Sequence, residues 1–244
     1  MEPRVALITG GVRGIGRAVA QALAARDWAI AVTYRKSEAD ATAIEAEFKA
    51  RNFRVMCIRK DVSEPGAAQE LREAVEREMG RIDALVNCAG PFRRIPLLEE
   101  SVEGWHSMFD NNLHPIFYLS RAIAPGMMER KWGRIVNFAI ANADQHIGQP
   151  NITAHYIAKT GVLILTRSLA KVLAPHGITV NAISPGFIET GSVPQDELSK
   201  MMKGVPAGYI GMPEDAAAAV CFLLSDEARY VNGTNIHVSG AWGV

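Results

Sequence analysis

The sequence predicts an α/β fold: one doubly wound domain, residues 1–244, in which a seven-stranded parallel sheet carries helices on both faces. Short apolar runs alternate with amphipathic stretches from one end of the 244-residue chain to the other. The runs are rich in Val and Ile and apolar on both sides, which is typical of buried parallel strands. Strand and helix repeated in this way imply right-handed crossovers. No linker-like change of composition interrupts the chain, so a single domain is the simplest interpretation.

Each predicted element follows from a run of this kind. The expected strands cover residues 4–8, 28–33, 53–58, 84–87, 134–138, 179–183 and 235–238. The expected helices cover residues 15–26, 39–50, 67–79, 102–130, 153–173 and 213–224. Pro115 lies inside the long stretch 102–130 and lacks an N–H, so we expect a local kink or an open hydrogen bond there. Residues 186–211 are mixed in character and are expected to form a flap at the substrate site.

Composition excludes several classes of protein. The chain has 26 Lys and Arg residues against 26 Asp and Glu residues, so it lacks the positive surplus of a protein that coats nucleic acid or an anionic membrane. No stretch approaches the ~20 continuous apolar residues of a membrane span. Cys57, Cys88 and Cys221 are widely spaced, which favours free thiols in a reducing, cytoplasmic compartment. The six histidines show no HxxxH spacing, so no metal site is expected.

A glycine-rich turn follows the first expected strand. Gly10, Gly14 and Gly16 lie between that strand and the first helix, which is the context that a dinucleotide-binding turn requires. The glycines allow a tight turn and close approach of a phosphate, while the helix N-terminus offers free N–H groups to an anion. Glycines that serve a turn and nothing else are the alternative.

Further segments complete a pattern. Asp61-Val62, Asn87-Cys88-Ala89-Gly90, Asn112-Leu113, Pro185-Gly186 with Thr190, and a closing strand near Gly240 follow the glycine turn in order. With these segments the sequence resembles the short-chain dehydrogenase/reductase family over almost the whole chain, and it is most similar to the 3-oxoacyl-carrier-protein reductase branch. The resemblance implies a Rossmann-like fold and a nicotinamide cofactor. The residues it assigns to the cofactor are Gly10, Arg13, Gly14, Ile15, Gly16, Arg35, Lys36, Asp61, Val62, Asn87, Ala89, Gly90, Lys159, Pro185, Gly186, Ile188 and Thr190.

Charge after the second strand favours NADP over NAD. NAD-dependent relatives usually place an Asp or Glu there, on the ribose 2′-hydroxyl. This chain has Arg35 and Lys36 at that point, and Arg13 in the glycine turn points to the same region. Cationic side chains form strong charge-assisted bonds to a 2′-phosphate. A solvated basic turn is the alternative.

The resemblance breaks at the catalytic residues. In the family a Tyr four residues before a Lys donates a proton to the substrate carbonyl, but His155 stands four before Lys159. Around the helix, His155 lies about 40° from Lys159 on one side. Tyr156, three residues before Lys159, lies about 60° from it on the other side. We therefore expect Tyr156 to point away from the place of the acid. His155 is open to three interpretations: a neutral donor, an acidic imidazolium, or a residue that fills the tyrosine space.

The family's catalytic serine is also missing. No Ser or Thr occurs from Asn137 to Ile152, and counting back from His155 leads to Asn142, whose amide can donate to a carbonyl. Asn112 and Lys159 match the family, in which the lysine binds the nicotinamide ribose. The candidate catalytic residues are therefore Asn112, Asn142, His155, Tyr156 and Lys159.

Two functions remain open on the sequence. One is an NADP-dependent oxidoreductase that moves hydride between NADPH and a carbonyl of a small-molecule substrate, such as a 3-oxoacyl thioester, with an altered active site. The other is an NADP-binding or sensing subunit that keeps the fold without turnover. The resemblance implies a homotetramer or homodimer, paired through the helices expected at 102–130 and 153–173.

Overall fold

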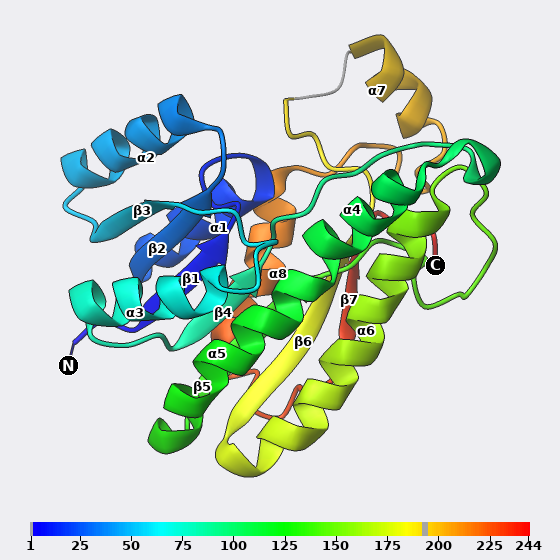
Figure 1. The fold of residues 1–244 in the computed structure, drawn as a ribbon. Coiled ribbons are helices and arrows are strands. Elements are labelled where there is room, and N and C mark those ends of the chain that lie inside the picture. Colours follow the sequence, from blue (N-terminus) through cyan, green and yellow to red (C-terminus); the bar gives the residue numbers. More distant parts are fainter. Residues whose placement is uncertain (1, 192–194) are drawn as a thin grey trace.

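The computed structural model describes residues 2–191 and 195–244. Its centre is one parallel sheet of seven strands in the order β3-β2-β1-β4-β5-β6-β7 (Figure 1). The strands are β1 (Val5–Thr9), β2 (Ala29–Tyr34), β3 (Val55–Arg59), β4 (Ala84–Asn87), β5 (Gly133–Phe138), β6 (Ile178–Pro185) and β7 (Asn235–Val238). The predicted seven-stranded parallel sheet is confirmed, and each strand end lies within two residues of its expected position.

Helices cover both faces of this sheet. They are α1 (Gly14–Ala24), α2 (Glu38–Ala50), α3 (Ala67–Met79), α4 (Val102–Asn112), α5 (His114–Arg130), α6 (Thr153–Leu173), α7 (Gln195–Met202) and α8 (Pro213–Leu224), with short 3-10 turns at Leu97–Glu99 and Ala174–His176. On one face, Val19 of α1, Phe48 of α2 and Val220 of α8 belong to one buried cluster. On the other, α3, α5 and α6 contribute to a second cluster. Strands β1 to β6 contribute to both clusters, while β7 packs on the first alone.

The helix expected over residues 102–130 is in fact two helices. α4 and α5 meet at Leu113, which ends the first and begins the second with φ −117° and ψ −53°. Pro115 lies in the first turn of α5, where a backbone N–H would have no intrahelical partner. Its lack of an N–H therefore costs the helix no hydrogen bond. The proline therefore begins a new helix. The expected irregularity near Asn112 is present, but as a break between two helices rather than as a kink or an open hydrogen bond within one helix.

The segment 186–211 contains structure that the sequence pattern did not predict. Its Ile188 forms a parallel bridge with Gly211, so the two ends of the segment lie together. Between them α7 covers Gln195–Met202, while residues 192–194 of the expected flap lie outside the described residues. Within residues 2–191 and 195–244, no helix combines the length and apolar character that a bilayer span needs.

The order of the strands creates a crevice at one edge of the sheet. From β1 the chain passes outward to β2 and β3, then returns to place β4 on the other side of β1. Crossovers on either side of the β1–β4 pair run away from each other, so the loops that follow these two strands separate. Ligands of open α/β sheets bind at such a switch point, outside the carboxyl ends of the strands.

A buried chain of amide hydrogen bonds crosses the sheet beneath this edge. The side-chain amide of Asn87 on β4 donates to Asn137 Oδ1 on β5 at 2.8 Å, and Asn137 Nδ2 donates to Thr166 Oγ1 on α6 at 2.9 Å. All three side chains are buried. These hydrogen bonds link the strand that ends at the crevice to the helix that carries Lys159.

We predict that Asn137→Ala lowers the free energy of unfolding by about 1–3 kcal/mol, because it leaves a buried amide and a buried hydroxyl without partners. Urea unfolding measures the change. The control is Thr42→Val, which removes an exposed hydroxyl bonded to Glu38 within α2 and should shift stability by less than about 0.5 kcal/mol. Equal stability of Asn137→Ala and the wild type would contradict the stabilising role of these hydrogen bonds.

Candidate active site

The glycine turn forms a cradle at the carboxyl end of β1. Gly10 and Gly14 have positive φ angles, +66° and +52°, which favour glycine. A Cβ on Gly16 would lie 2.4 Å from the carbonyl oxygen of Gly10, so the backbone packs too closely for any side chain. Thr9 Oγ1 accepts from the backbone N–H groups of Cys88 and Ala89, at 3.1 and 3.0 Å, and so ties the turn to the end of β4.

The N-terminus of α1 is open to an anion. α1 begins at Gly14, and its N-cap residue Arg13 makes no side-chain cap hydrogen bond. The first turn holds no acidic side chain either. Free N–H groups and the positive end of the helix dipole therefore meet at the glycine cradle, an arrangement suited to a diphosphate.

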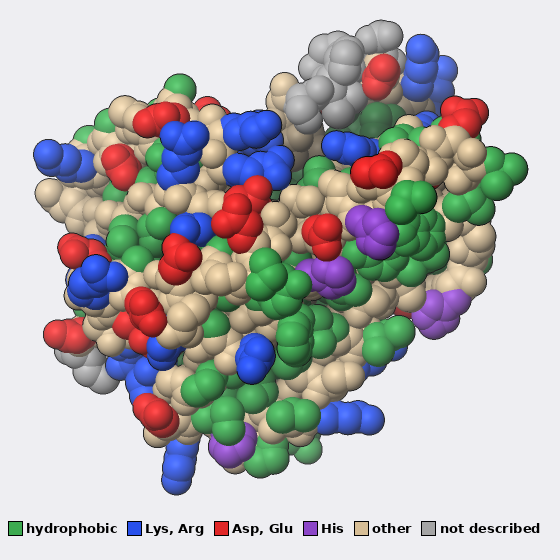
Figure 2. Space-filling model, in the orientation of Figure 1, with side chains coloured by type: hydrophobic (Ala, Val, Ile, Leu, Met, Phe, Trp, Pro, Cys, Tyr) green, Lys and Arg blue, Asp and Glu red, His purple; other side chains and the backbone are tan. Residues whose placement is uncertain are grey.

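The basic residues near this cradle divide into two groups. Arg35 donates to Asp61 Oδ2 at 3.2 Å and to Asn111 Oδ1 at 3.4 Å, across the ends of β2, β3 and α4. Burial raises the pKa of Asp61, but hydrogen bonds from Ser63 and the Arg35 guanidinium lower it overall. Arg13 and Lys36 are exposed and have no ion-pair partner among the described residues. Figure 2 shows Lys and Arg side chains gathered along the upper edge of this face, above the sheet.

The remaining residues predicted for the cofactor lie at the same edge of the sheet. Gly186 follows β6 and packs on Ser239, whose Cα would lie 2.8 Å from a Cβ on that glycine. A Cβ on Gly14 would lie 3.4 Å from Thr190 Cγ2, so the start of segment 186–211 touches the glycine cradle. The others are half-buried, in the first turn of α1 or at the ends of β3, β4 and β6: Ile15, Val62, Ala89, Pro185 and Ile188.

Asn112 closes the crevice on the side of α4. Its Nδ2 donates to the carbonyls of Pro91, at 3.2 Å, and Met108, at 3.0 Å. A Cβ on Gly90 would lie 2.4 Å from Asn112 Oδ1, so glycine is required where the chain leaves β4. The loop after β4 is thereby held against the end of α4.

Lys159 brings a buried ammonium to the carboxyl end of β5. Its Nζ donates to the Phe138 carbonyl at 2.8 Å, and the residue is only 6% exposed. Burial lowers the pKa of the ammonium to about 8, although the nearby Cys88 opposes the shift. Among the described residues Nζ makes no other hydrogen bond, so two of its three N–H donors are left for a ligand.

His155 lies one helical turn before Lys159 and is also buried. Its ring meets the Phe92 ring edge to face, with the centroids 5.1 Å apart. Burial and the Lys159 cation lower the pKa of the imidazole to about 3, against the raising effect of a backbone hydrogen bond with Pro91. The ring is therefore neutral near pH 7, which argues against the imidazolium interpretation.

The Tyr156 hydroxyl is hydrogen-bonded to the loop after β5. It donates to the Asn142 carbonyl at 2.7 Å and accepts from the Ile147 N–H at 3.3 Å. The tyrosine therefore fastens the loop 142–147 to α6. Asn142 has a positive φ of +64° and contributes its backbone carbonyl to this bond.

Three aromatic side chains at this edge were not predicted from sequence. Phe92 packs on His155, and Phe187 packs on Trp242 with ring centroids 4.4 Å apart. Phe187 lies two residues after β6, and Trp242 lies four residues after β7. Loops carry no periodic pattern, and these two residues are far apart in the sequence, so their contact could not be predicted.

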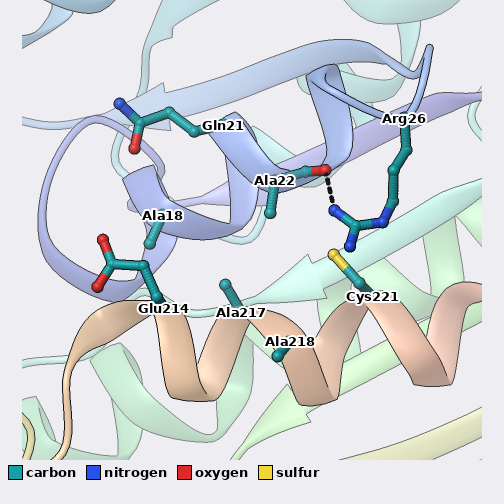
Figure 3. A pocket seen from close by; sticks show the side chains of 8 residues that line it. All are labelled: Ala18, Gln21, Ala22, Arg26, Glu214, Ala217, Ala218 and Cys221. Atoms are coloured by element: carbon teal, nitrogen blue, oxygen red, sulfur yellow. Dashed lines mark hydrogen bonds between the residues drawn. The ribbon is translucent and has the colours of Figure 1, made fainter.

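A groove elsewhere on the molecule is separate from these residues. It has a volume of about 310 Å³ and lies between α1 and α8, lined by Ala18, Gln21, Ala22, Arg26, Glu214, Ala217, Ala218 and Cys221 (Figure 3). Arg26 donates to the Ala22 carbonyl across one end of it, at 2.7 Å. None of the predicted site residues lines this groove. We therefore place the candidate site at the carboxyl edge of the sheet.

The residues at that edge fit a nicotinamide dinucleotide. Asn112 Oδ1, Asn142 Oδ1 and His155 Nδ1 are buried without a hydrogen-bond partner among the described residues. Buried polar atoms in native proteins are nearly always paired, so these three atoms are open to a ligand or an ordered water. The glycine cradle suits the diphosphate, and the spare donors of Lys159 suit sugar hydroxyls. The described part of the chain holds no cluster of three or more metal-ligating side chains.

The neutral state of His155 generates a stability prediction. Below its ordinary pKa of 6.5 an unfolded His takes up a proton that the folded protein does not, because the folded pKa is about 3. The free energy of unfolding should therefore fall as pH decreases from about 6.5 towards 3, by up to about 1.4 kcal/mol per pH unit from this group. His155→Phe should remove that contribution in urea unfolding, while His106→Phe, an exposed control, keeps it. Identical slopes for His155→Phe and the wild type would contradict a neutral buried imidazole.

Comparisons with known proteins agree with the geometry. A family profile described as Enoyl-(Acyl carrier protein) reductase matches residues 10–242. The 3-oxoacyl-(acyl-carrier-protein) reductase FabG of Haemophilus influenzae is 37% identical over 243 residues, covering 98% of both chains. FabG of Escherichia coli K12 is 38% identical, covering 98% of this chain and 97% of its own.

Solved structures give the same result. A protein of Agrobacterium tumefaciens assigned as a gluconate dehydrogenase superposes with a TM-score of 0.91 at 30% identity, over 98% of this chain and 95% of its own. A protein of Sinorhizobium meliloti 1021 assigned as a short-chain alcohol dehydrogenase also superposes with a TM-score of 0.91, at 31% identity, over 99% of this chain and 97% of its own. The chain therefore belongs to the short-chain dehydrogenase/reductase family of oxidoreductases.

Proposed function

We propose that the protein is an NADP-dependent carbonyl reductase whose substrate is a 3-oxoacyl thioester or a similar small carbonyl compound. The observation that carries this proposal is the buried Lys159 ammonium, held by the Phe138 carbonyl with two donors to spare beside the glycine cradle. The FabG relatives, which are 3-oxoacyl-(acyl-carrier-protein) reductases by name, support the choice of substrate class.

NADPH, when bound, supplies the hydride. For its 2′-phosphate the chain offers Arg13 and Lys36, both exposed and without an ion-pair partner among the described residues. Arg35 can join them once it leaves Asp61, a partner it holds through an exposed ion pair. No acidic side chain stands directly after β2 to repel the phosphate, since residues 35–37 are Arg, Lys and Ser.

The cofactor proposal predicts a selective effect of Arg13. NADPH should bind at least about tenfold more tightly than NADH, and Arg13→Ala should weaken NADPH binding by about tenfold without changing NADH binding. Fluorescence titration of the purified protein measures both. The control is Arg26→Ala, which removes an Arg near the other end of α1. Equal losses for NADH and NADPH in Arg13→Ala would contradict recognition of the 2′-phosphate.

The proton for the reduced oxygen comes from Lys159 in this proposal. A neutral His155 can release a proton only by becoming an imidazolate, and the Tyr156 hydroxyl is bonded to the loop 142–147. Burial lowers the pKa of the Lys159 ammonium to about 8, so this side chain can give up a proton near physiological pH. With the hydride supplied by bound NADPH, which would leave as NADP⁺, the Lys159 ammonium would protonate the carbonyl oxygen to give an alcohol, and its amine would regain a proton from solvent.

This role of Lys159 predicts a pH profile. The rate of reduction should fall as pH rises through about 8, since the ammonium is then lost. Lys159→Arg keeps a cation but holds its proton too tightly, so kcat should fall at least about 100-fold. Tyr156→Phe should keep the same pH profile as the wild type. A profile that stays flat through this range, or Lys159→Arg activity within about tenfold of wild type, would contradict Lys159 as the acid.

A binding or sensing subunit is the second candidate. The observation that favours it is the absence of both family hydroxyls, since no Ser or Thr occurs from Asn137 to Ile152 and His155 stands at the Tyr position. Tight NADPH binding without oxidation of NADPH by any member of a panel of 3-oxoacyl thioesters, ketones, quinones and pterins would select this function. Turnover of any one of them would select the reductase.

A second copy of this chain is the proposed protein partner, as a homodimer or homotetramer. Apolar side chains lie exposed on α5 and α6, among them Phe117, Ile157 and Ile164. Figure 2 shows apolar side chains gathered over α4 and α6 on this face. Such a patch supports pairing of two copies through α4, α5 and α6.

A further inference from the structure

The last residues of the chain run across the carboxyl edge of the sheet. We define residues 239–244 as the C-terminal tail; it follows β7 directly. Gly240 in this tail accepts a hydrogen bond from the Ala207 N–H at 3.0 Å. Its φ is +59°, and a Cβ there would lie 2.8 Å from Val205 Cγ1 and 3.0 Å from Ala207 Cβ. The tail backbone therefore packs directly on the second half of segment 186–211.

Trp242 holds the first half of the same segment. Its ring lies 4.4 Å from the ring of Phe187, centroid to centroid, at an interplanar angle of 41°. Both side chains are half-buried. Because Phe187 begins the segment and Ala207 lies near its end, the tail contacts it on both sides of α7.

The other side of the tail meets the loop that Tyr156 fastens. Gly243 has a φ of +72°, and a Cβ there would lie 3.3 Å from both the N and the Cβ of Asn142. The Asn142 carbonyl in turn accepts from the Tyr156 hydroxyl at 2.7 Å. The tail thus stands between segment 186–211 and the loop 142–147, the two segments that border the candidate site on the side of β5 and β6.

We propose that the C-terminal tail positions segment 186–211 against the loop 142–147, with Trp242 as the positioning residue, and so sets the affinity for the carbonyl substrate. This inference rests on the proposed reductase function for its kinetic consequence. Ser239 of the tail packs on Gly186, a residue expected at the cofactor, but the Trp242 ring packs on Phe187 and takes no part in the cradle contacts of Thr9 with Ala89 and Gly10 with Gly16. Loss of the Trp242 ring should therefore affect substrate binding far more than cofactor binding.

The test compares Trp242→Ala, Trp242→Phe and the control Tyr230→Ala. Tyr230 is 99% exposed and precedes β7, at the opposite end of that strand from the tail. Hydrogen exchange of the free protein, followed by mass spectrometry, reports on residues 186–191, 204–211 and 139–147. NADPH titration and steady-state kinetics are measured on the same variants.

The expected result is faster exchange in all three regions for Trp242→Ala, with KM raised at least about tenfold, kcat less affected and the NADPH Kd within about twofold of wild type. Trp242→Phe should restore most of the wild-type values, because a ring still packs on Phe187. Tyr230→Ala should match the wild type throughout.

Unchanged exchange in Trp242→Ala would overturn the proposal whatever the activity, and so would equal weakening of NADPH and substrate binding. Should Trp242→Ala not fold, Trp242→Leu replaces it, and the same comparison with Trp242→Phe decides. If the wild type turns over no substrate, the reductase function fails, while the exchange data still decide whether the tail positions the two segments.

Discussion

The site depends on one buried hydrogen bond, from the Lys159 ammonium to the Phe138 carbonyl. An ammonium taken out of water is costly unless acceptors replace its hydration, and here a single carbonyl at 2.8 Å does so among the described residues. Because one carbonyl replaces only part of the lost hydration, the pKa of Lys159 is lowered to about 8, and the ammonium can bind further acceptors. The same cation, together with burial, keeps His155 neutral. For this reason the proposed function assigns the proton chemistry at this edge of the sheet to the lysine.

The strands and loops around these groups bring them together at the carboxyl edge of the sheet. Parallel pairing of β4, β5 and β6 brings the ends of all three strands to the same edge. The bond chain Asn87–Asn137–Thr166 then fixes α6, and with it Lys159, to that edge. The loops that complete the site are held by a few bonds between a side chain and the backbone, such as those of Thr9 and Tyr156. The proposed reductase relies on this positioning and on the electrostatics of Lys159.

Sequence reasoning reached the elements whose signal is local. Apolar runs located all seven strands, and glycines at 10, 14 and 16 identified the cradle because tight turns demand that residue. It failed where a distant neighbour decides the outcome. The ion pair of Arg35 with Asp61, which the chain brings beside it through β3, was not predicted. Pro115 begins a helix because it falls in a first turn, a position that its local pattern did not reveal. The contact of Trp242 with Phe187 arises only when β6 and β7 pair.

A crystal structure of the protein with NADPH tests the central claim most directly. The account predicts the diphosphate on the N–H groups of α1 and a ribose hydroxyl about 3 Å from Lys159 Nζ, with the bond to the Phe138 carbonyl retained. A cofactor bound with its nicotinamide ribose away from Lys159, or a Lys159 side chain turned out of the crevice, would contradict the account.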